Sequence, residues 1–180
     1  MGTSVVMKAD GTDITQLIDQ EADAYRGEED RPLGSYVALL AAYGIVVAFL
    51  SFIVRITGRR LPERFSAPDL ALLTIATHKV ARILTKDPVT SPVRAPFTLY
   101  AGTAGEGEVA EEVRGRGLRH ALGELMTCPF CLGQWVATGF AFGFVAAPRH
   151  TRLVASTFAA LTGADFLQFA YSKAQQSQQD

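Results

Sequence analysis

The chain has little of what soluble enzymes and secreted domains usually carry. Two cysteines in 180 residues, three positions apart, cannot build a disulfide framework. No glycine-rich phosphate loop, nucleophile elbow or readable catalytic triad is present. No basic stripe interleaved with aromatic residues occurs either, so nucleic-acid binding is not expected. These absences argue against an ordinary soluble enzyme, and no cofactor is expected.

Acidic residues are concentrated near the N-terminus. Residues 1–31 carry eight acidic and three basic residues, whereas the remainder carries ten acidic and fourteen basic ones. Apolar sequence begins only after this acidic lead, which is not the pattern of a cleavable signal peptide. We expect residues 1–31 to be a flexible tail with at most one weak helix over Asp13–Tyr25, and residues 173–180 to be a polar tail.

What the chain does have is long apolar runs, the first over Pro32–Val54. This run holds 23 residues without a charge. At about 1.5 Å per residue, such a helix spans the ~30 Å hydrocarbon core of a bilayer. A helix of a soluble domain is rarely apolar on every side. The run therefore predicts a transmembrane helix over residues 32–54.

A second uncharged run, Leu125–Pro148, precedes a further apolar stretch. Pro129 suits the first turn of a helix, which predicts a span over Pro129–Ala147. A short link, residues 149–152, leads to Leu153–Ser172, so the two spans predict a transmembrane helical hairpin. Lipid supplies no hydrophobic force between helices, so small residues are expected to line the seam. They are Gly139, Gly143, Ala155, Ala159 and Gly163. Alternatively, these glycines only reflect the frequency of glycine in membrane helices.

A helix of mixed character is predicted over residues 67–85. Ser66 begins it like a capping box, its first half is apolar, and its second half carries His78, Lys79 and Arg82. Charges make crossing costly, so this helix lies in the interface, enters the bilayer part-way, or crosses while packed against other helices.

The rest of the chain is predicted to be irregular apart from a short helix over residues 118–126. Proline at every fourth position from Pro88 to Pro96 precludes a regular helix. We therefore expect a flexible Pro/Gly-rich loop over residues 86–117. The predicted fold class is an all-α integral membrane protein with an N-terminal transmembrane helix, one short polar-apolar helix and a C-terminal transmembrane hairpin.

The distribution of Lys and Arg favours one topology. If the helix over 67–85 does not cross, residues 55–127 and the C-terminus share twelve Lys and Arg, against five in the N-terminal tail and the hairpin turn. If it crosses, the link 55–68 and the turn 149–152 share six, against nine on the other side. Lys and Arg favour the cytoplasmic side, so the first arrangement is preferred, with the N-terminus outside.

Cys128-Pro129-Phe130-Cys131 is the most conspicuous motif. Two thiols at a helix N-terminus form a candidate redox dithiol, because the helix end stabilises a thiolate. The preferred topology places Cys128 on the cytoplasmic side, which argues against a stable disulfide. The pair also supplies two of the four ligands of a zinc site, with His120 or His78 as weak further candidates. The structural alternative is that Cys128 caps and packs the start of the helix.

A second constellation consists of polar residues in or beside apolar segments. Its members are His78, Arg82, Asp87, Arg94 and Asp165. A carboxylate within an apolar span is costly without a partner. We expect Arg82 or His78 to pair with Asp165 and so to dock the helix over 67–85 onto the hairpin. A proton or ion pathway is the alternative.

Several of these residues together resemble a known family. They are Arg82-x-x-x-x-Asp87, Thr90-x-x-x-Arg94-x-x-Phe97 and Gly123-Glu124-Leu125-x-x-Cys128-Pro129-x-Cys131-x-Gly133-x-Trp135. The pattern resembles small bacterial and phage membrane proteins of domain of unknown function 1360, some of which carry a sporulation-protein label. The resemblance covers roughly residues 67–172. It implies a membrane location and a shared site but no activity. The family's counterpart of the helix over residues 67–85 is usually more apolar, which favours a helix that crosses the membrane here too.

The leading hypothesis is a non-enzymatic anchor or assembly component of the cell membrane with several membrane passes. Its expected partners are the lipid bilayer and either a protein partner or a second copy of the chain. The alternatives are a membrane thiol-redox protein that uses Cys128 and Cys131, and a metal-binding membrane module.

Overall fold

A computed structural model describes residues 20–25 and 31–178. Most of the predicted acidic tail and the last two residues of the predicted polar tail lie outside the described residues. Within the tail, residues 20–25 are helical, so the weak helix predicted over Asp13–Tyr25 is described only in its last six residues.

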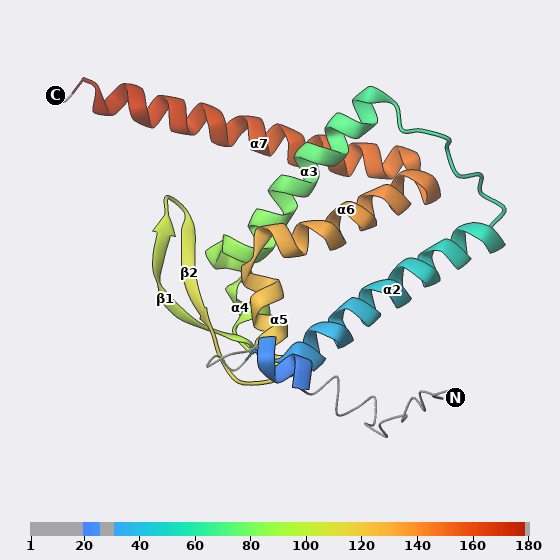
Figure 1. Cartoon of the computed structure of the whole chain (residues 1–180). Coiled ribbons are helices and arrows are strands. Elements are labelled where there is room, and N and C mark those ends of the chain that lie inside the picture. Colours follow the sequence, from blue (N-terminus) through green and yellow to red (C-terminus); the bar gives the residue numbers. More distant parts are fainter. Residues whose placement is uncertain (1–19, 26–30, 179–180) are drawn as a thin grey trace, which may run out of the picture.

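The described chain is mostly helical (Figure 1). Its elements are α2 (Leu33–Ile56), α3 (Ala67–Lys86), the 3-10 turn η1 (Pro88–Thr90), α4 (Ser91–Arg94), β1 (Thr98–Gly105), β2 (Glu108–Val113), α5 (Leu118–Thr127), α6 (Pro129–Ala146) and α7 (Pro148–Gln176). Among the described residues, α2, α6 and α7 are long and apolar enough to cross a membrane. The predicted helices are all present, although α7 begins at Pro148 and absorbs the link predicted over residues 149–152.

The prediction of an all-α fold is wrong in one region, because β1 and β2 form an antiparallel hairpin. It pairs Thr98 with Val113 and Gly105 with Glu108 within the segment predicted as a flexible loop, residues 86–117. The prolines do keep the helical pieces of this segment short, since η1 has three residues and α4 has four. The missed signal is the glycine-containing turn before Glu108–Val113, which separates two segments able to pair as a hairpin.

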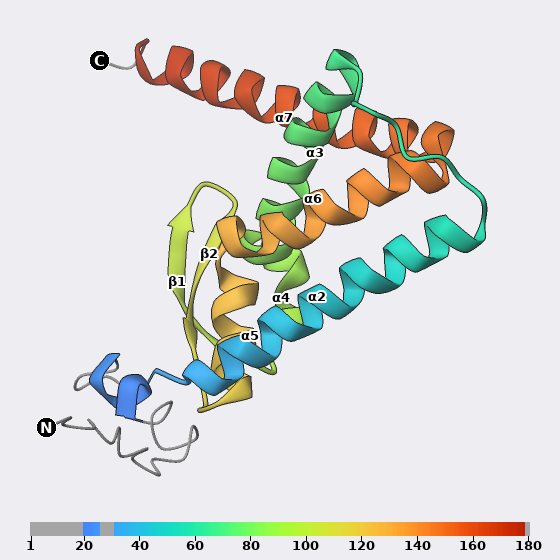
Figure 2. The same ribbon diagram turned by 45° about the vertical axis from the view of Figure 1, so that its right-hand side comes forward.

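Helix α3 packs on both α6 and α7, which contact each other mainly near their turn (Figure 2). The small core between these three helices is formed by Ala76, Phe144 and Ala155. Of the predicted seam, Ala155 is fully buried, and a side chain at Gly143 would come within 2.8 Å of the Thr151 hydroxyl. The seam prediction is wrong for Gly139 and Gly163, because nothing lies within 4 Å of a Cβ at either position. Instead, α3 fills the space between the hairpin helices.

Side-chain contacts show the direction of α3. Arg152 near the start of α7 bonds Asp69 near the start of α3, with both guanidinium–carboxylate distances below 3 Å. Before α3, the ring of Phe65 packs edge-on against Phe144 near the end of α6, with centroids 6.0 Å apart. Helix α3 therefore starts beside the start of α7, crosses it obliquely, and runs in the direction opposite to α6.

The first half of α2 docks on α5 and α6. Tyr36 donates a hydrogen bond of 2.5 Å to Glu124. Tyr43 bonds Thr138 at 2.8 Å and packs edge-on against Trp135, with ring centroids 5.1 Å apart. Trp135, the last residue of the family-like motif, therefore has a packing partner within the protein.

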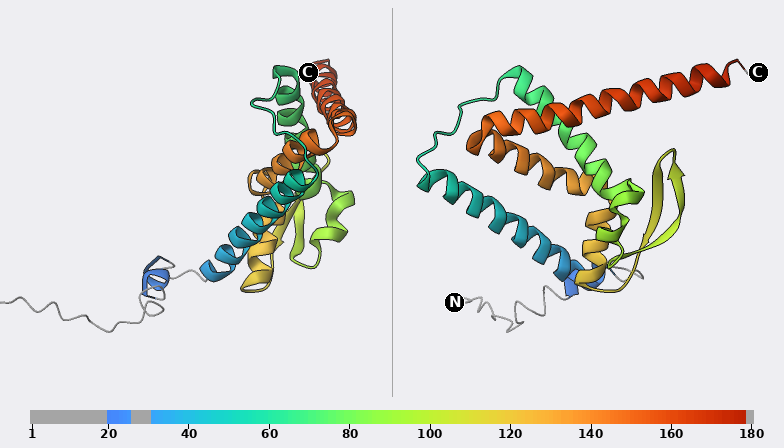
Figure 3. Two further views of the ribbon diagram at one scale, coloured as in Figure 1. Left: turned by 90° about the vertical axis from the view of Figure 1, so that its right-hand side faces the viewer. Right: turned by 180° about the vertical axis from the view of Figure 1, so that it is seen from behind.

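The molecule thus has two ends, which Figure 3 shows from two further sides. At the turn end lie the end of α2, residues 57–66, the start of α3 and the turn at Ala147 between α6 and α7. At the sheet end lie the start of α2, the end of α3, the β1–β2 hairpin, α5 and Cys128. Helices α2, α3 and α6 run between these two ends, whereas α7 starts at the turn end and its C-terminal half extends away from the other elements.

Candidate functional site

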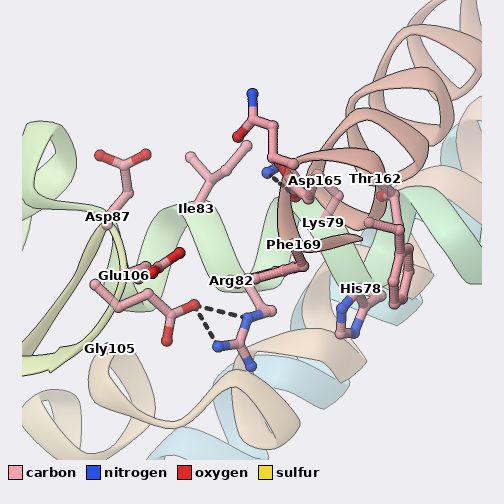
Figure 4. A pocket seen from close by; sticks show the side chains of 14 residues that line it. His78, Lys79, Arg82, Ile83, Asp87, Gly105, Glu106, Thr162, Asp165 and Phe169 are labelled. Atoms are coloured by element: carbon pink, nitrogen blue, oxygen red, sulfur yellow. Dashed lines mark hydrogen bonds and ion pairs between the residues drawn. The ribbon is translucent and has the colours of Figure 1, made fainter. Parts of the chain in front are cut away.

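A polar cavity of about 670 Å³ lies near the sheet end between α3, the tip of the hairpin and α7 (Figure 4). Its lining consists of His78, Lys79, Arg82, Ile83, Asp87, Gly105, Glu106, Gly107, Glu108, Thr162, Asp165, Phe166, Gln168 and Phe169. Four of the five polar residues singled out in the sequence converge here, namely His78, Arg82, Asp87 and Asp165. Arg94 does not line the cavity.

Lys79 is the partner of Asp165 in this cavity. Its Nζ lies 2.5 Å from Oδ2 of Asp165. The prediction that Asp165 pairs with Arg82 or His78 is therefore wrong in the residue, although the pair does dock α3 onto α7. The way in which α3 crosses α7 explains the difference, because it brings Asp165 beside the turn of α3 from which Lys79 points towards α7.

Arg82 points instead towards the hairpin and holds its tip. Its Nε donates to Oε1 of Glu108 at 2.9 Å, and its Nη2 bonds the same oxygen. Sequence reasoning missed Glu108 because it did not predict the hairpin.

Two further carboxylates line the same cavity. Asp87 accepts a 2.8 Å bond from the backbone N–H of Val89 and so caps η1. Glu106, in the turn of the hairpin, makes no hydrogen bond or ion pair with another of the residues that the structure describes. The cavity therefore holds two ion pairs and two carboxylates that no basic side chain within residues 20–25 and 31–178 opposes.

Arg94 forms a separate network at the base of the hairpin. Its side chain is fully buried, and its Nε and Nη2 donate to the two carboxylate oxygens of Glu111 at 2.8 and 2.9 Å. The remaining donors reach the carbonyl oxygens of Leu84 and Asp87 and the hydroxyls of Thr90 and Ser91. Burial alone would raise the pKa of Glu111, but the bonds from Arg94 and Thr98 outweigh it and lower that pKa. This network joins α3, α4 and β2.

Cys128 sits at the N-cap of α6. Its Sγ accepts a hydrogen bond of 3.2 Å from the backbone N–H of Cys131. Both thiols are free, and Cys131 is exposed. Cys128 therefore has the capping role that the structural alternative predicted, and it lies at the sheet end.

The weak metal candidates do not gather into one site. His120 contacts Glu124 at 3.5 Å, and His78 lies in the cavity. Within residues 20–25 and 31–178, no group of three or more His, Cys, Asp and Glu side chains is placed to hold a metal ion.

Gly123 and Glu124 begin the family-like motif that includes Cys128, and the structure shows a packing role for each of them. A Cβ at Gly123 would lie 2.6 Å from Cγ1 of Val113 and 2.9 Å from the carbonyl oxygen of Phe97, so a larger residue would push the hairpin away from α5. Glu124 receives the hydroxyl of Tyr36 and lies 3.8 Å from Arg31. The motif thus holds the hairpin on one side and α2 on the other.

Comparison with known proteins identifies the family of this chain. Residues 72–171 match the family described as "Protein of unknown function (DUF1360)". This chain belongs to that family. It is also 32% identical over 71 residues to the "Sporulation protein YjcA" of Bacillus subtilis (strain 168). The aligned residues make up 38% of this chain and 60% of that protein. The matched part is thus less than two thirds of that relative's length. No solved structure matches the chain.

The predicted family is therefore confirmed. The DUF1360 match begins in the first turns of α3 and ends in α7, so it contains the cavity, the Arg94 network and the Cys128 cap. Helix α2 lies outside the match, as the sequence predicted.

Proposed function

We propose that this DUF1360 protein is a non-enzymatic membrane anchor or assembly component with several membrane passes, which presents its sheet end to a protein partner or a second copy. The observation that carries this proposal is that the polar side chains of the family region hold elements together. Arg94 is fully occupied with its neighbours, Arg82 holds the hairpin, and Cys128 caps a helix. These bonds create a stiff surface rather than a reactive group.

The proposed topology has four crossings, with α3 crossing alongside α2, α6 and α7. Twenty residues at about 1.5 Å each span ~30 Å, and α3 runs from the turn end to the sheet end beside two apolar spans. Its charges are opposed by other side chains, Asp69 by Arg152 and Lys79 by Asp165. Such pairing lowers the cost of charges within a membrane. This arrangement replaces the one preferred from the charge count, in which α3 does not cross.

With four crossings, the N-terminus, the sheet end and the C-terminus share one side. That side carries nine Lys and Arg against six at the turn end, so we place it in the cytoplasm. Cys128 is cytoplasmic in both arrangements, whereas the N-terminus and the link between α2 and α3 change sides. A reducing compartment argues against a stable disulfide there.

Thiol-redox chemistry remains the competing function, favoured by the exposure of Cys131 beside Cys128 at a helix N-terminus. Alkylation of the thiols in cells, before and after reduction, separates the two proposals. If the protein is an anchor, both cysteines are alkylated without prior reduction. A population that becomes alkylated only after reduction, with a defined reduction potential, would show that an anchor role is insufficient.

The capping role of Cys128 makes a prediction about stability. Serine accepts the same hydrogen bond, so Cys128→Ser should leave the free energy of unfolding of the detergent-solubilised protein nearly unchanged. Alanine cannot accept it, and Cys128→Ala should cost about 1 kcal/mol. Thermal unfolding of the two variants measures the difference, with Cys131→Ala as the matched control because the capping contact uses only the backbone of Cys131. Equal stability of the two Cys128 variants would contradict the capping role.

A further inference from the structure

The polar cavity has an uneven distribution of charge and apolar surface. Asp87 and Glu106 lie at one end, beyond Arg82, where α3 ends and the hairpin turns (Figure 4). Lys79 and Arg82 come from the next turns of α3. Phe169, from α7, lies beside Arg82 in the middle of the cavity, and His78 and Thr162 lie at the other end. The cavity is therefore acidic at its outer end, cationic further along α3, and aromatic on the side of α7.

The position of the cavity points to an amphiphilic ligand. One wall is α7, which is long and apolar enough to cross a membrane, and Phe166, Leu167 and Phe169 on this helix are each more than half exposed. The opposite wall contains the end of α3 and the polar tip of the hairpin. In the topology proposed above, on which this inference rests, the cavity lies at the boundary between lipid and water near the sheet end.

We propose that the cavity binds the headgroup of a zwitterionic phospholipid of the phosphatidylethanolamine type. Its phosphodiester lies against Arg82 and Lys79, and its ammonium lies between Asp87 and Glu106. Its acyl chains leave past Phe166 and Phe169 along α7. A volume of about 670 Å³ accommodates such a headgroup with its glycerol, since ligand pockets typically measure about 300–1,000 Å³.

The balance of charge favours a zwitterion over an anion. Lys79 and Arg82 are each already opposed by a carboxylate, Asp165 and Glu108 respectively. With Asp87 and Glu106, the cavity contains four carboxylates and two basic side chains, not counting His78. A purely anionic headgroup would meet this excess of negative charge, whereas an ammonium group compensates it. The phosphate competes with Glu108 for Arg82, a residue whose guanidinium suits bidentate phosphate recognition.

Native mass spectrometry of the full chain in detergent tests the proposal. The probes are dioleoyl phosphatidylethanolamine, dioleoyl phosphatidylglycerol and water-soluble glycerophosphoethanolamine. We expect the ethanolamine lipid to bind more tightly than the glycerol lipid. Arg82→Gln should weaken its binding about tenfold, because a charge-assisted hydrogen bond is lost. Lys173→Gln, which removes a positive charge from α7 outside the cavity, should leave binding unchanged.

Glu106→Gln is the variant that cannot be confused with misfolding, since Glu106 is exposed and makes no bond with another described residue. It should reduce the preference for the ethanolamine lipid over the glycerol lipid about fivefold, the effect of one exposed ion pair. Equal binding of the two lipids by the unsubstituted chain, or an unchanged preference in Glu106→Gln, would overturn the proposal. If glycerophosphoethanolamine binds as tightly as the lipid, the cavity recognises the headgroup but the proposal that its ligand is a membrane lipid is overturned. Lipid binding in detergent does not depend on the membrane topology. A negative result here can therefore be distinguished from a negative result in the cysteine-accessibility test of the topology.

Discussion

Replacement of Arg94 by methionine is expected to lower the free energy of unfolding by about 3–5 kcal/mol, the usual cost of removing one partner from a buried ion pair. Methionine is long and apolar enough to occupy much of the same space. It leaves Glu111, whose side chain is 5% exposed, without its guanidinium. It also removes a donor from the carbonyl oxygens of Leu84 and Asp87, of which that of Asp87 keeps its bonds from Thr90.

Thermal or denaturant unfolding in detergent measures this effect, with Arg114→Met as the control. Arg114 lies just beyond β2, and its side chain makes only a long exposed contact of 3.4 Å to Pro96. The double variant Arg94→Met, Glu111→Gln should recover part of the loss, because a neutral amide keeps its bonds to Ser91 and Thr98 without a buried charge. Failure of the second substitution to recover any stability would refute the electrostatic explanation.

Replacement of Asp165 by asparagine is expected to cost about 2–3 kcal/mol, the penalty for a charge left unpaired within a membrane helix. The uncompensated group is the Lys79 ammonium, whose side chain is 19% exposed and directed at α7. Lys79→Met should be milder, since the carboxyl of Asp165 can take up a proton. The charge swap Lys79→Asp, Asp165→Lys should be closer in stability to the unsubstituted chain than Asp165→Asn is.

Thermal stability in lipid nanodiscs is the measurement for this pair. Lys173→Met serves as the control for loss of a charge from the last turn of α7. If Asp165→Asn is as stable as the unsubstituted chain, the pair does not hold α3 against α7. A crossing of α3 with its charges compensated would then be unsupported.

The apolar helices were predictable from the sequence because their signal is local. An uncharged run of 23 residues determines α2, and Pro129 marks the start of α6. The β1–β2 hairpin was missed because its strands lie among prolines and glycines and depend on contacts with distant residues. Arg94 on α4 and Gly123 on α5 supply those contacts.

The cavity was predictable in its composition but not in its pairing. Polar residues on α3 and α7 stand out against apolar surroundings, so His78, Arg82, Asp87 and Asp165 could be selected. Which of them pair depends on the relative direction of α3 and α7, and no local pattern encodes it. The topology proposed above differs from the one favoured by the charge count, because that count treats each segment separately and leaves out the packing of α3 against α6 and α7.

The central claim is that α3 crosses the membrane together with α2, α6 and α7, so that the turn end and the sheet end lie on opposite sides. Single cysteines at Arg60 in the turn-end link and at Gly105 in the hairpin test it, in a Cys128→Ser, Cys131→Ser background. With a membrane-impermeant maleimide, we predict that Arg60→Cys is labelled in intact cells and that Gly105→Cys is labelled only after the membrane is opened. Labelling of both positions from the same side would contradict the account.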